Sequence, residues 1–285
     1  MRLLLISLCS LILLGMMLAT ARFWGLGIPY QEFKHDFFEK RALYTLRVEN
    51  LGQAADAIKA DPDVVLWIDV RITKDQKLIV LSPETSQSYL KKESIGSEFI
   101  GSKVHYYNWS LLKSLFVEAK FLSDFVSQFP QQRFIINVID NQYQIDELVV
   151  SELKAHSPEK RFLIQSETDI IIKSVKEREP FWLYGMSLPE LTRLVTFSSI
   201  GLHPAISVRG DVLITPFKIH QRNFMNEEVL LEMKRRMKKI LLGPLKNDAD
   251  MNQAASLFQK NLIDGFIIEN PKQIKLISAQ IGAIK

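Results

Sequence analysis

From residue 38 onward, short apolar runs of strand length alternate with longer amphipathic runs of helix length. The clearest strand candidates are Arg133–Ile139, Phe162–Gln165 and Gly265–Ile268. The first two are each followed by a helical pattern, at Gln144–Ala155 and Asp169–Glu177. Roughly seven or eight such units over about 240 residues predict an α/β fold of the (β/α)₈ TIM-barrel type, with an open doubly wound sheet as the alternative.

The remaining elements follow the same alternation. Further strands are expected at Arg41–Val48, Phe181–Tyr184, Ala205–Val208, Val212–Ile214 and Lys239–Leu242, and further helices at Asn50–Ala60, Trp109–Phe116, Lys120–Phe129, Leu188–Leu194, Glu227–Lys238, Ala249–Lys260 and Pro271–Ile281. The sequence contains neither a glycine-rich turn of the dinucleotide-binding type nor a P-loop, which disfavours the open sheet.

The N-terminus is a separate feature. Leu3–Ala21 is free of charge, is flanked by arginines, and approaches the length of about 20 residues that crosses a bilayer. Phe23 and Trp24 resemble an interfacial anchor, which favours a retained signal anchor. The A-x-A sequence at 19–21 leaves a cleaved signal peptide open, and a buried core helix is the third alternative. Both main interpretations predict a domain outside the cytoplasm, membrane-anchored or secreted.

We therefore divide the chain into a signal anchor or signal peptide at 1–22, a connector at 23–37 and a barrel domain at 38–285. The composition, 47% hydrophobic and 24% charged, is that of a globular protein. A net charge of +4 and the lack of any nucleic-acid-binding motif argue against a nucleic-acid partner. Cys9 is the only cysteine, which excludes an intrachain disulfide and a cysteine-bound metal in the barrel.

The stretch Val64–Thr85 reads as two strands joined by a tight turn. Side chains alternate faces along a strand, so one face carries Ile68, Val70 and Ile72 and the other carries Trp67, Asp69 and Arg71. A carboxylate and a guanidinium on an inner face predict a polar pocket at the end of the strand. We expect Asp69 to pair with Arg71 or Arg41, and cation binding by Asp69 is the alternative.

Several short motifs occur in a fixed order. They are KRA at 40–42 and ENL at 49–51, then WIDV at 67–70, TKD at 73–75 and VLS at 80–82, and finally LSDF at 122–125, Asn137, IQS at 164–166 and DGFIIENP at 264–271. Together they resemble the motifs of the glycerophosphodiester phosphodiesterases, which are TIM-barrel enzymes. The resemblance covers about Phe38–Ile274 and implies the same barrel.

The departures from that family fall on its catalytic positions. In the family, two histidines act as general acid and base, and a divalent cation, commonly calcium or magnesium, is held by three carboxylates. By this resemblance the histidine positions are occupied by Lys40 and Ser82, neither of which readily exchanges a proton near neutral pH. Trp67 and Asn137 replace two of the carboxylates, which leaves Asp69 as a weak metal ligand.

The resemblance also assigns substrate binding to Arg41 and Glu49, since an arginine can hold a phosphate bidentately. The first hypothesis is thus a divergent pseudoenzyme that binds a phosphodiester, a phospholipid headgroup or a protein partner without a cofactor. The second is an active phosphodiesterase that uses calcium or magnesium. The third is a structural or interaction protein whose barrel mouth is closed by Trp67.

Two further patterns each allow two interpretations. The histidines at 35, 105, 156, 203 and 220 are expected to be solvated loop residues, with a relocated acid–base pair as the alternative. The basic run at 234–239 lies on a predicted helix and is expected to form its solvated face, with contact to anionic lipid headgroups as the alternative.

Overall fold

The computed structural model describes residues 2–28, 30, 35–39, 42–82, 104–219, 222–223 and 227–283. Its centre is a ring of parallel strands in the order β7-β6-β5-β2-β1-β12-β11-β8. Their bounds are β1 Leu43–Arg47, β2 Val65–Ile72, β5 Phe134–Val138, β6 Phe162–Gln165, β7 Leu183–Tyr184, β8 Val212–Thr215, β11 Lys239–Leu245 and β12 Gly265–Ile268.

The two ends of this sheet meet and close the barrel. Gly185, directly after β7, forms a parallel bridge with Val212 of β8. The amide of Met186 donates to the carbonyl of Val212 at 2.9 Å, and the amide of Asp211 donates to the carbonyl of Tyr184 at 2.7 Å. The predicted (β/α)₈ barrel is therefore confirmed over the open-sheet alternative.

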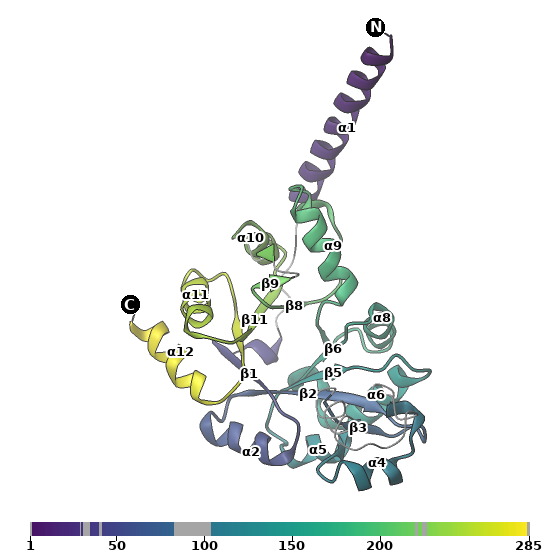
Figure 1. The fold of residues 1–285 in the computed structure, drawn as a ribbon, viewed down its shortest axis with the longest axis vertical. Helices are drawn as coiled ribbons and strands as arrows, with labels where there is room; N and C mark the ends of the chain where they lie inside the picture. Colours follow the sequence, from purple (N-terminus) through teal and green to yellow (C-terminus); the bar gives the residue numbers. More distant parts are fainter. Residues whose placement is uncertain are drawn as a thin grey trace.

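Helices surround the barrel, as Figure 1 shows. The helices of this ring are α2 Leu51–Ala60, α5 Leu122–Gln128, α6 Ile145–Leu153, α8 Asp169–Arg178, α9 Leu188–Ser198, α10 Glu227–Arg235, α11 Asp248–Gln259 and α12 Lys272–Ala283. Shorter elements are β3 Leu78–Val80, β4 Lys120–Phe121, α4 Trp109–Leu115, α7 Pro158–Arg161, β9 Lys218–Ile219, β10 Arg222–Asn223, and the 3₁₀ turns η1 Asp36–Phe38, η2 Val104–Tyr106, η3 Lys154–His156 and η4 His203–Ala205.

The structure corrects two sequence-based elements. The strand predicted at 205–208 is wrong, because His203–Ala205 is a 3₁₀ turn and the residues that follow it pair with no strand. The carbonyl of Ile206, which a sheet would need, accepts instead from Arg236 at 2.6 Å. The helix predicted from Lys120 begins only at Leu122, since Lys120 and Phe121 pair with β3 as β4.

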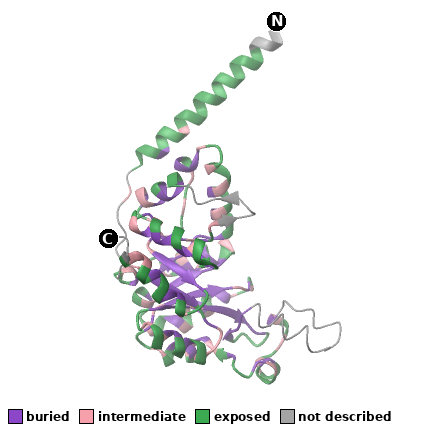
Figure 2. Ribbon diagram, turned by 60° about the vertical axis from the view of Figure 1, so that its left-hand side comes forward, coloured by how far each residue is buried: buried purple, intermediate pink, exposed green. Residues whose placement is uncertain are grey.

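The inside of the barrel is apolar at the N-terminal ends of the strands. Buried side chains from all eight strands meet there: Leu43, Val65, Ile135, Leu163, Leu183, Val212, Leu241 and Ile267. Phe37 of η1 belongs to the same cluster and is fully buried, so it plugs this end of the barrel. Arg133 holds the plug, because its guanidinium donates to the carbonyl of Phe37 at 2.6 Å. Figure 2 shows the buried strands at the centre.

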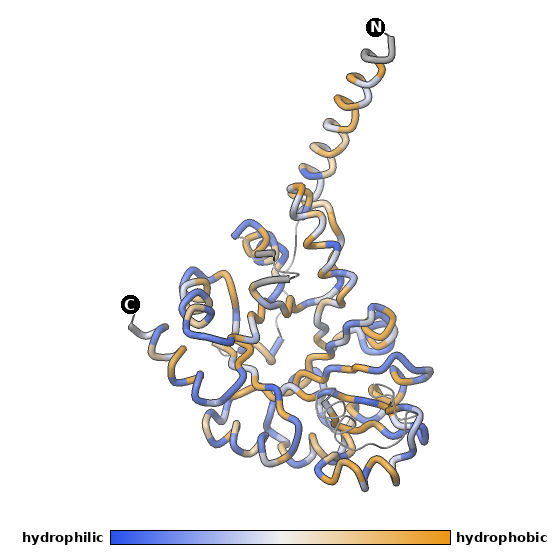
Figure 3. The backbone as a smooth tube through the Cα atoms, in the orientation of Figure 1, coloured by the Kyte–Doolittle hydropathy of each residue, from blue (hydrophilic) through white to orange (hydrophobic). Residues whose placement is uncertain are grey.

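Helix α1 (Arg2–Gly27) projects away from the barrel with its apolar surface exposed (Figures 2 and 3). Its segment Ile6–Gly27 has a mean hydropathy of 1.9 and is long and apolar enough to cross a membrane. The base of α1 rests on η4. A side chain at Gly25 has no space, since its Cβ would lie 2.0 Å from the carbonyl oxygen of Pro204.

Arg235 fastens the base of α1 to the barrel. Its guanidinium donates to the carbonyls of Gly25, Leu26 and Ile28 at 3.0, 3.2 and 2.9 Å, which are groups that a helix end leaves unsatisfied. Glu232 holds Arg235 in place at 2.7 Å and also accepts from Arg236 at 2.6 Å. We call Glu232, Arg235 and Arg236 the clamp.

The clamp overturns the expectation that the run 234–239 is a solvated basic face. Arg236 is 3% exposed. Every cation of the run lies beside a carboxylate: Lys234 and Lys239 beside Asp264, Arg235 and Arg236 beside Glu232, and Lys238 beside Asp211. The end of α10 and the start of β11 are thus integrated into the fold through Glu232 on α10 itself and through the more distant carboxylates of Asp211 and Asp264.

The ion pairs of the clamp make the unfolding free energy depend on pH. Burial by itself raises the pKa of Glu232, but hydrogen bonds from Arg235 and Arg236 outweigh it and lower the pKa below the usual 4.5. Ionised Glu232 therefore stabilises the folded state above that pH, and the stabilisation is lost as the pH falls through the lowered pKa. We expect the difference in unfolding free energy between the wild type and Glu232→Gln, measured with urea in detergent, to shrink below about pH 4.5. A constant difference would contradict this.

The plug is expected to be a major source of stability. Phe37→Ala leaves a cavity at the end of the barrel and should lower the unfolding free energy by about 3–5 kcal/mol. Phe181, which is 74% exposed, is the matched control, and Phe181→Ala should change stability by no more than about 0.5 kcal/mol. Equal losses in urea unfolding of the two variants would show that Phe37 is no plug.

Candidate ligand site at the barrel mouth

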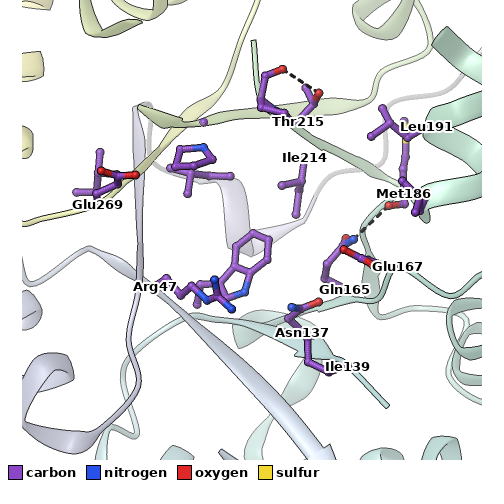
Figure 4. A pocket seen from close by; sticks show the side chains of 17 residues that line it. Arg47, Asn137, Ile139, Gln165, Glu167, Met186, Leu191, Ile214, Thr215 and Glu269 are labelled. Atoms are coloured by element: carbon purple, nitrogen blue, oxygen red, sulfur yellow. Dashed lines mark hydrogen bonds between the residues drawn. The ribbon is translucent and has the colours of Figure 1, made fainter. Parts of the chain in front are cut away.

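A cavity of about 600 Å³ lies at the C-terminal ends of the strands, where TIM-barrel sites form (Figure 4). Its polar lining includes Arg47, Asn137, Gln165, Glu167, Thr215 and Glu269. Its apolar lining includes Trp67, Met186, Leu188, Leu191, Ile214, Pro216 and Ile267. Within the part of the chain that is described, Trp67 forms a wall of this cavity and leaves it open, so the closed mouth of the third hypothesis is wrong.

Arg47 reaches the mouth because of strand alternation. Leu43 of β1 points into the barrel, so Arg47, four residues later on the same face, enters the mouth from the end of the strand. Parallel pairing places Arg47 beside Trp67 of β2, and places Asp69 of β2 beside Asn137 of β5. Three neighbouring strands thus bring these four side chains together.

Both oxygens of the Asp69 carboxylate are occupied by these neighbours. Oδ2 accepts from Nε of Arg47 at 2.7 Å and from a second nitrogen of the same guanidinium. Oδ1 accepts from Nδ2 of Asn137 at 2.6 Å and from Nε1 of Trp67 at 3.2 Å. Asp69 is 2% exposed, so it is a buried carboxylate satisfied wholly by side-chain donors.

This arrangement does not fit the calcium or magnesium ion that the family resemblance implies. Such ions need several oxygen ligands, usually with more than one carboxylate. Here the residues around Asp69 offer N–H groups, and the guanidinium of Arg47 supplies the positive charge instead. Over the described ranges, no group of three or more His, Cys, Asp or Glu residues is placed to hold a metal.

Glu49 and Ser82 lie beside this cluster. The hydroxyl of Ser82 donates to Oε1 of Glu49 at 2.7 Å, and Ser82 is 2% exposed. Glu49 lines a hollow next to the mouth, which shares Arg47 and Glu269 with it. Lys40 and Arg41, the other two positions assigned by the resemblance, lie outside the described residues, and both precede β1.

A second ion pair lies two residues farther along β2, toward its C-terminal end. The guanidinium of Arg71 donates to Oδ1 of Asp140 at 2.9 Å, and the other oxygen of Asp140 accepts from the amide of Ile72 at 3.0 Å. The expectation that Asp69 pairs with Arg71 is therefore wrong. The inner face of β2 carries two carboxylate–guanidinium pairs, each joined to a different neighbour.

Sequence reasoning missed most of the polar residues of the mouth. The missed residues all lie at or just after the C-terminal end of a strand: Arg47, Gln165, Glu167 and Glu269. That position was the sequence signal that could have identified them as site residues. The described histidines are elsewhere, at 35 and 105 beside or in the turns η1 and η2, and at 156 and 203 in η3 and η4. None of them lines the cavity, and His203 is only 5% exposed, so the expectation of a solvated histidine is wrong at that position. His220 lies outside the described residues.

Comparisons with known proteins support the fold. The sequence matches no protein-family model, and no curated protein sequence matches it. Among solved structures, a glycerophosphodiester phosphodiesterase from Agrobacterium tumefaciens has a TM-score of 0.59 at 11% identity, over 85% of this chain and 99% of that one. A glycerophosphoryl diester phosphodiesterase domain from Mycobacterium tuberculosis has a TM-score of 0.62 at 11% identity, over 86% of this chain and 100% of that one.

A phosphodiesterase from Oleispira antarctica, solved with its product sn-glycerol-3-phosphate, has a TM-score of 0.55 at 15% identity, over 84% of this chain and 97% of that one. Sequence identities this low show the fold alone. The barrel is thus similar to those of glycerophosphodiester phosphodiesterases, as the motif order predicted.

Rebuilding the carboxylates should create a metal site. The combined variant Arg47→Ala, Trp67→Glu, Asn137→Glu removes the guanidinium and surrounds Asp69 with acidic side chains. We expect calcium to raise the melting temperature of this variant, with a stabilisation of about 2.7 kcal/mol at a hundredfold excess over Kd. The wild type and Arg47→Ala alone should not respond in the same thermal scan. An equal response of the wild type would contradict the arrangement described for Asp69.

Proposed function

We propose that this chain is a catalytically impaired relative of the glycerophosphodiester phosphodiesterases whose barrel mouth binds a phosphodiester headgroup without hydrolysing it. The observation that carries the proposal is the Asp69 carboxylate, which is hydrogen-bonded by Arg47, Trp67 and Asn137. Metal-assisted hydrolysis requires a cation that polarises the phosphoryl oxygen. At this position a fixed guanidinium stands instead, and it cannot exchange a proton at neutral pH.

The charges of the mouth favour a zwitterionic ligand. Arg47 is the cation of the lining, while Glu167 and Glu269 are its anions. Figure 4 shows Arg47 and Glu269 on one side of the cavity, with Gln165 and Glu167 across from them. Arg47 stays paired with Asp69 but lines the cavity, so the single negative charge of a diester phosphate suits its exposed side. An attached ammonium group suits the two carboxylates.

The apolar wall supports the same ligand. Trp67 contributes an aromatic ring to the same lining as the two carboxylates, and aromatic rings attract quaternary ammonium groups by about 0.5–2 kcal/mol. The Oleispira antarctica structure holds sn-glycerol-3-phosphate, which supports a glycerophosphate moiety as part of the ligand. The candidate ligand is therefore a glycerophosphodiester with a choline or ethanolamine substituent.

The proposed location is the outer side of a membrane, with α1 as the tether. The apolar segment Ile6–Gly27 has the length of a spanning helix. The barrel holds the base of α1 through Arg235, which supports a retained helix over a cleaved one.

The decisive assay is hydrolysis of glycerophosphocholine by the purified full chain in detergent, with calcium or magnesium added. We expect no choline release above the buffer rate. Turnover that disappears in Asp69→Ala would overturn the proposal and would make the chain an active phosphodiesterase.

Binding is tested by calorimetry with the same chain. We expect glycerophosphocholine to bind more tightly than glycerol phosphate, because the monoester lacks the ammonium group and carries more negative charge. Glu269→Gln should weaken glycerophosphocholine binding severalfold, consistent with about 1 kcal/mol for a partly exposed ion pair. Glu179→Gln is the control, because Glu179 caps the end of α8 that is far from the mouth; this variant should bind like the wild type. Loss of the preference for the diester would contradict the ligand class.

A further inference from the structure

The junction of α1 and α9 exposes a cluster of bulky apolar side chains. Phe23 and Trp24 of α1 are 72% and 77% exposed. On the other side of the junction, Phe197 at the end of α9 is 36% exposed and Ile200 is 63% exposed. Figure 1 shows the end of α9 next to the base of α1. A soluble surface rarely gathers exposed aromatic residues in this way without a partner.

A hydrogen bond joins α1 to the end of α9 directly beside this cluster. The guanidinium of Arg22 donates to the carbonyl of Gly201 at 2.8 Å, directly after Ile200. Gly201 has a φ of +70°, which favours glycine, and a Cβ there would lie 2.7 Å from Nη1 of Arg22. The backbone at the end of α9 is thus shaped to receive Arg22.

The junction is also rigid. Gly25 packs on Pro204 with no space for a side chain, and Arg235 of the clamp holds three carbonyls at the end of α1. The barrel therefore has one orientation relative to α1. If α1 crosses a bilayer, the end of α9 has one fixed height relative to the lipid surface.

We propose that the end of α9 is a membrane-contacting element, in which Phe197 and Ile200 enter the lipid interface beside Phe23 and Trp24. This surface is called the footprint. The proposed partner of the footprint is a lipid bilayer, because the footprint continues the apolar surface of α1, and α1 is long enough to span a bilayer. Aromatic side chains at the end of a spanning helix favour the headgroup level, which sets the depth of the whole cluster. The inference rests on the anchoring role proposed for α1.

The position of the footprint limits how far the barrel mouth can lie from the lipid surface. Helix α9 begins at the mouth, where Leu188 and Leu191 line the cavity, and ends at the footprint. Its 11 residues span about 16 Å. The mouth therefore lies about 16 Å from the footprint, measured along the axis of α9.

The test uses the full chain in phosphatidylcholine–phosphatidylglycerol vesicles. Cys9→Ser removes the native thiol, so Ile200→Cys carries a single environment-sensitive fluorophore. Ile170→Cys on α8 is the matched control, because Ile170 is 66% exposed and lies on another part of the helical ring. Lipids with a nitroxide near the headgroup quench a probe that lies about 5–10 Å deep. We expect quenching and a blue shift at position 200, with neither at position 170.

A second variant tests the coupling. Gly25→Leu places a side chain against Pro204 and should abolish quenching at position 200 while the protein stays in the membrane fraction. Quenching that persists in Gly25→Leu, or equal quenching at positions 200 and 170 in the parent, would overturn the footprint. Recovery of the parent in the soluble fraction would instead overturn the anchoring role of α1, so the two failures are distinct.

Discussion

The pairing of Asp69 with Arg47 organises the barrel mouth. A carboxylate that is 2% exposed needs charge compensation and hydrogen-bond donors, and one guanidinium supplies both to one of its oxygens. Asn137 and Trp67 satisfy the other oxygen. The three partners come from the three adjacent strands β1, β2 and β5, so the pairing also fixes how these strand ends meet. The same contacts occupy both oxygens of Asp69, and this supports the proposal of a catalytically impaired barrel.

Much of the fold was predictable because its signals are local. The strands Phe162–Gln165 and Gly265–Ile268 are apolar runs bounded by polar residues, and both boundaries agree with the structure. The inward and outward faces of β2 followed from alternation. The strand predicted at 205–208 failed because its carbonyl at Ile206 is taken by Arg236, some 30 residues later, which no local pattern reveals.

The candidate site was less predictable, because its partners are distant in the sequence. The resemblance placed Asp69, Trp67 and Asn137 at equivalent family positions, and strand register brings all three together. Arg47 was missed because the motif match drew attention to Arg41, before the strand. Glu167 and Glu269 follow strands of ordinary composition, so no local pattern marks them as site residues. Only the closed barrel shows that both line one cavity.

The contacts at the base of α1 have a consequence for how the barrel would search for ligands. Most anchored domains hang on flexible linkers, so their local ligand concentration depends on linker length. Here Gly25 and Arg235 fasten the helix end to the barrel, and Phe37, only about ten residues beyond α1, already lies in the core. If α1 spans a bilayer, as proposed, these contacts keep the barrel mouth at one distance from the lipid surface. The domain would then bind ligands that reach that distance and would miss those that lie nearer or farther.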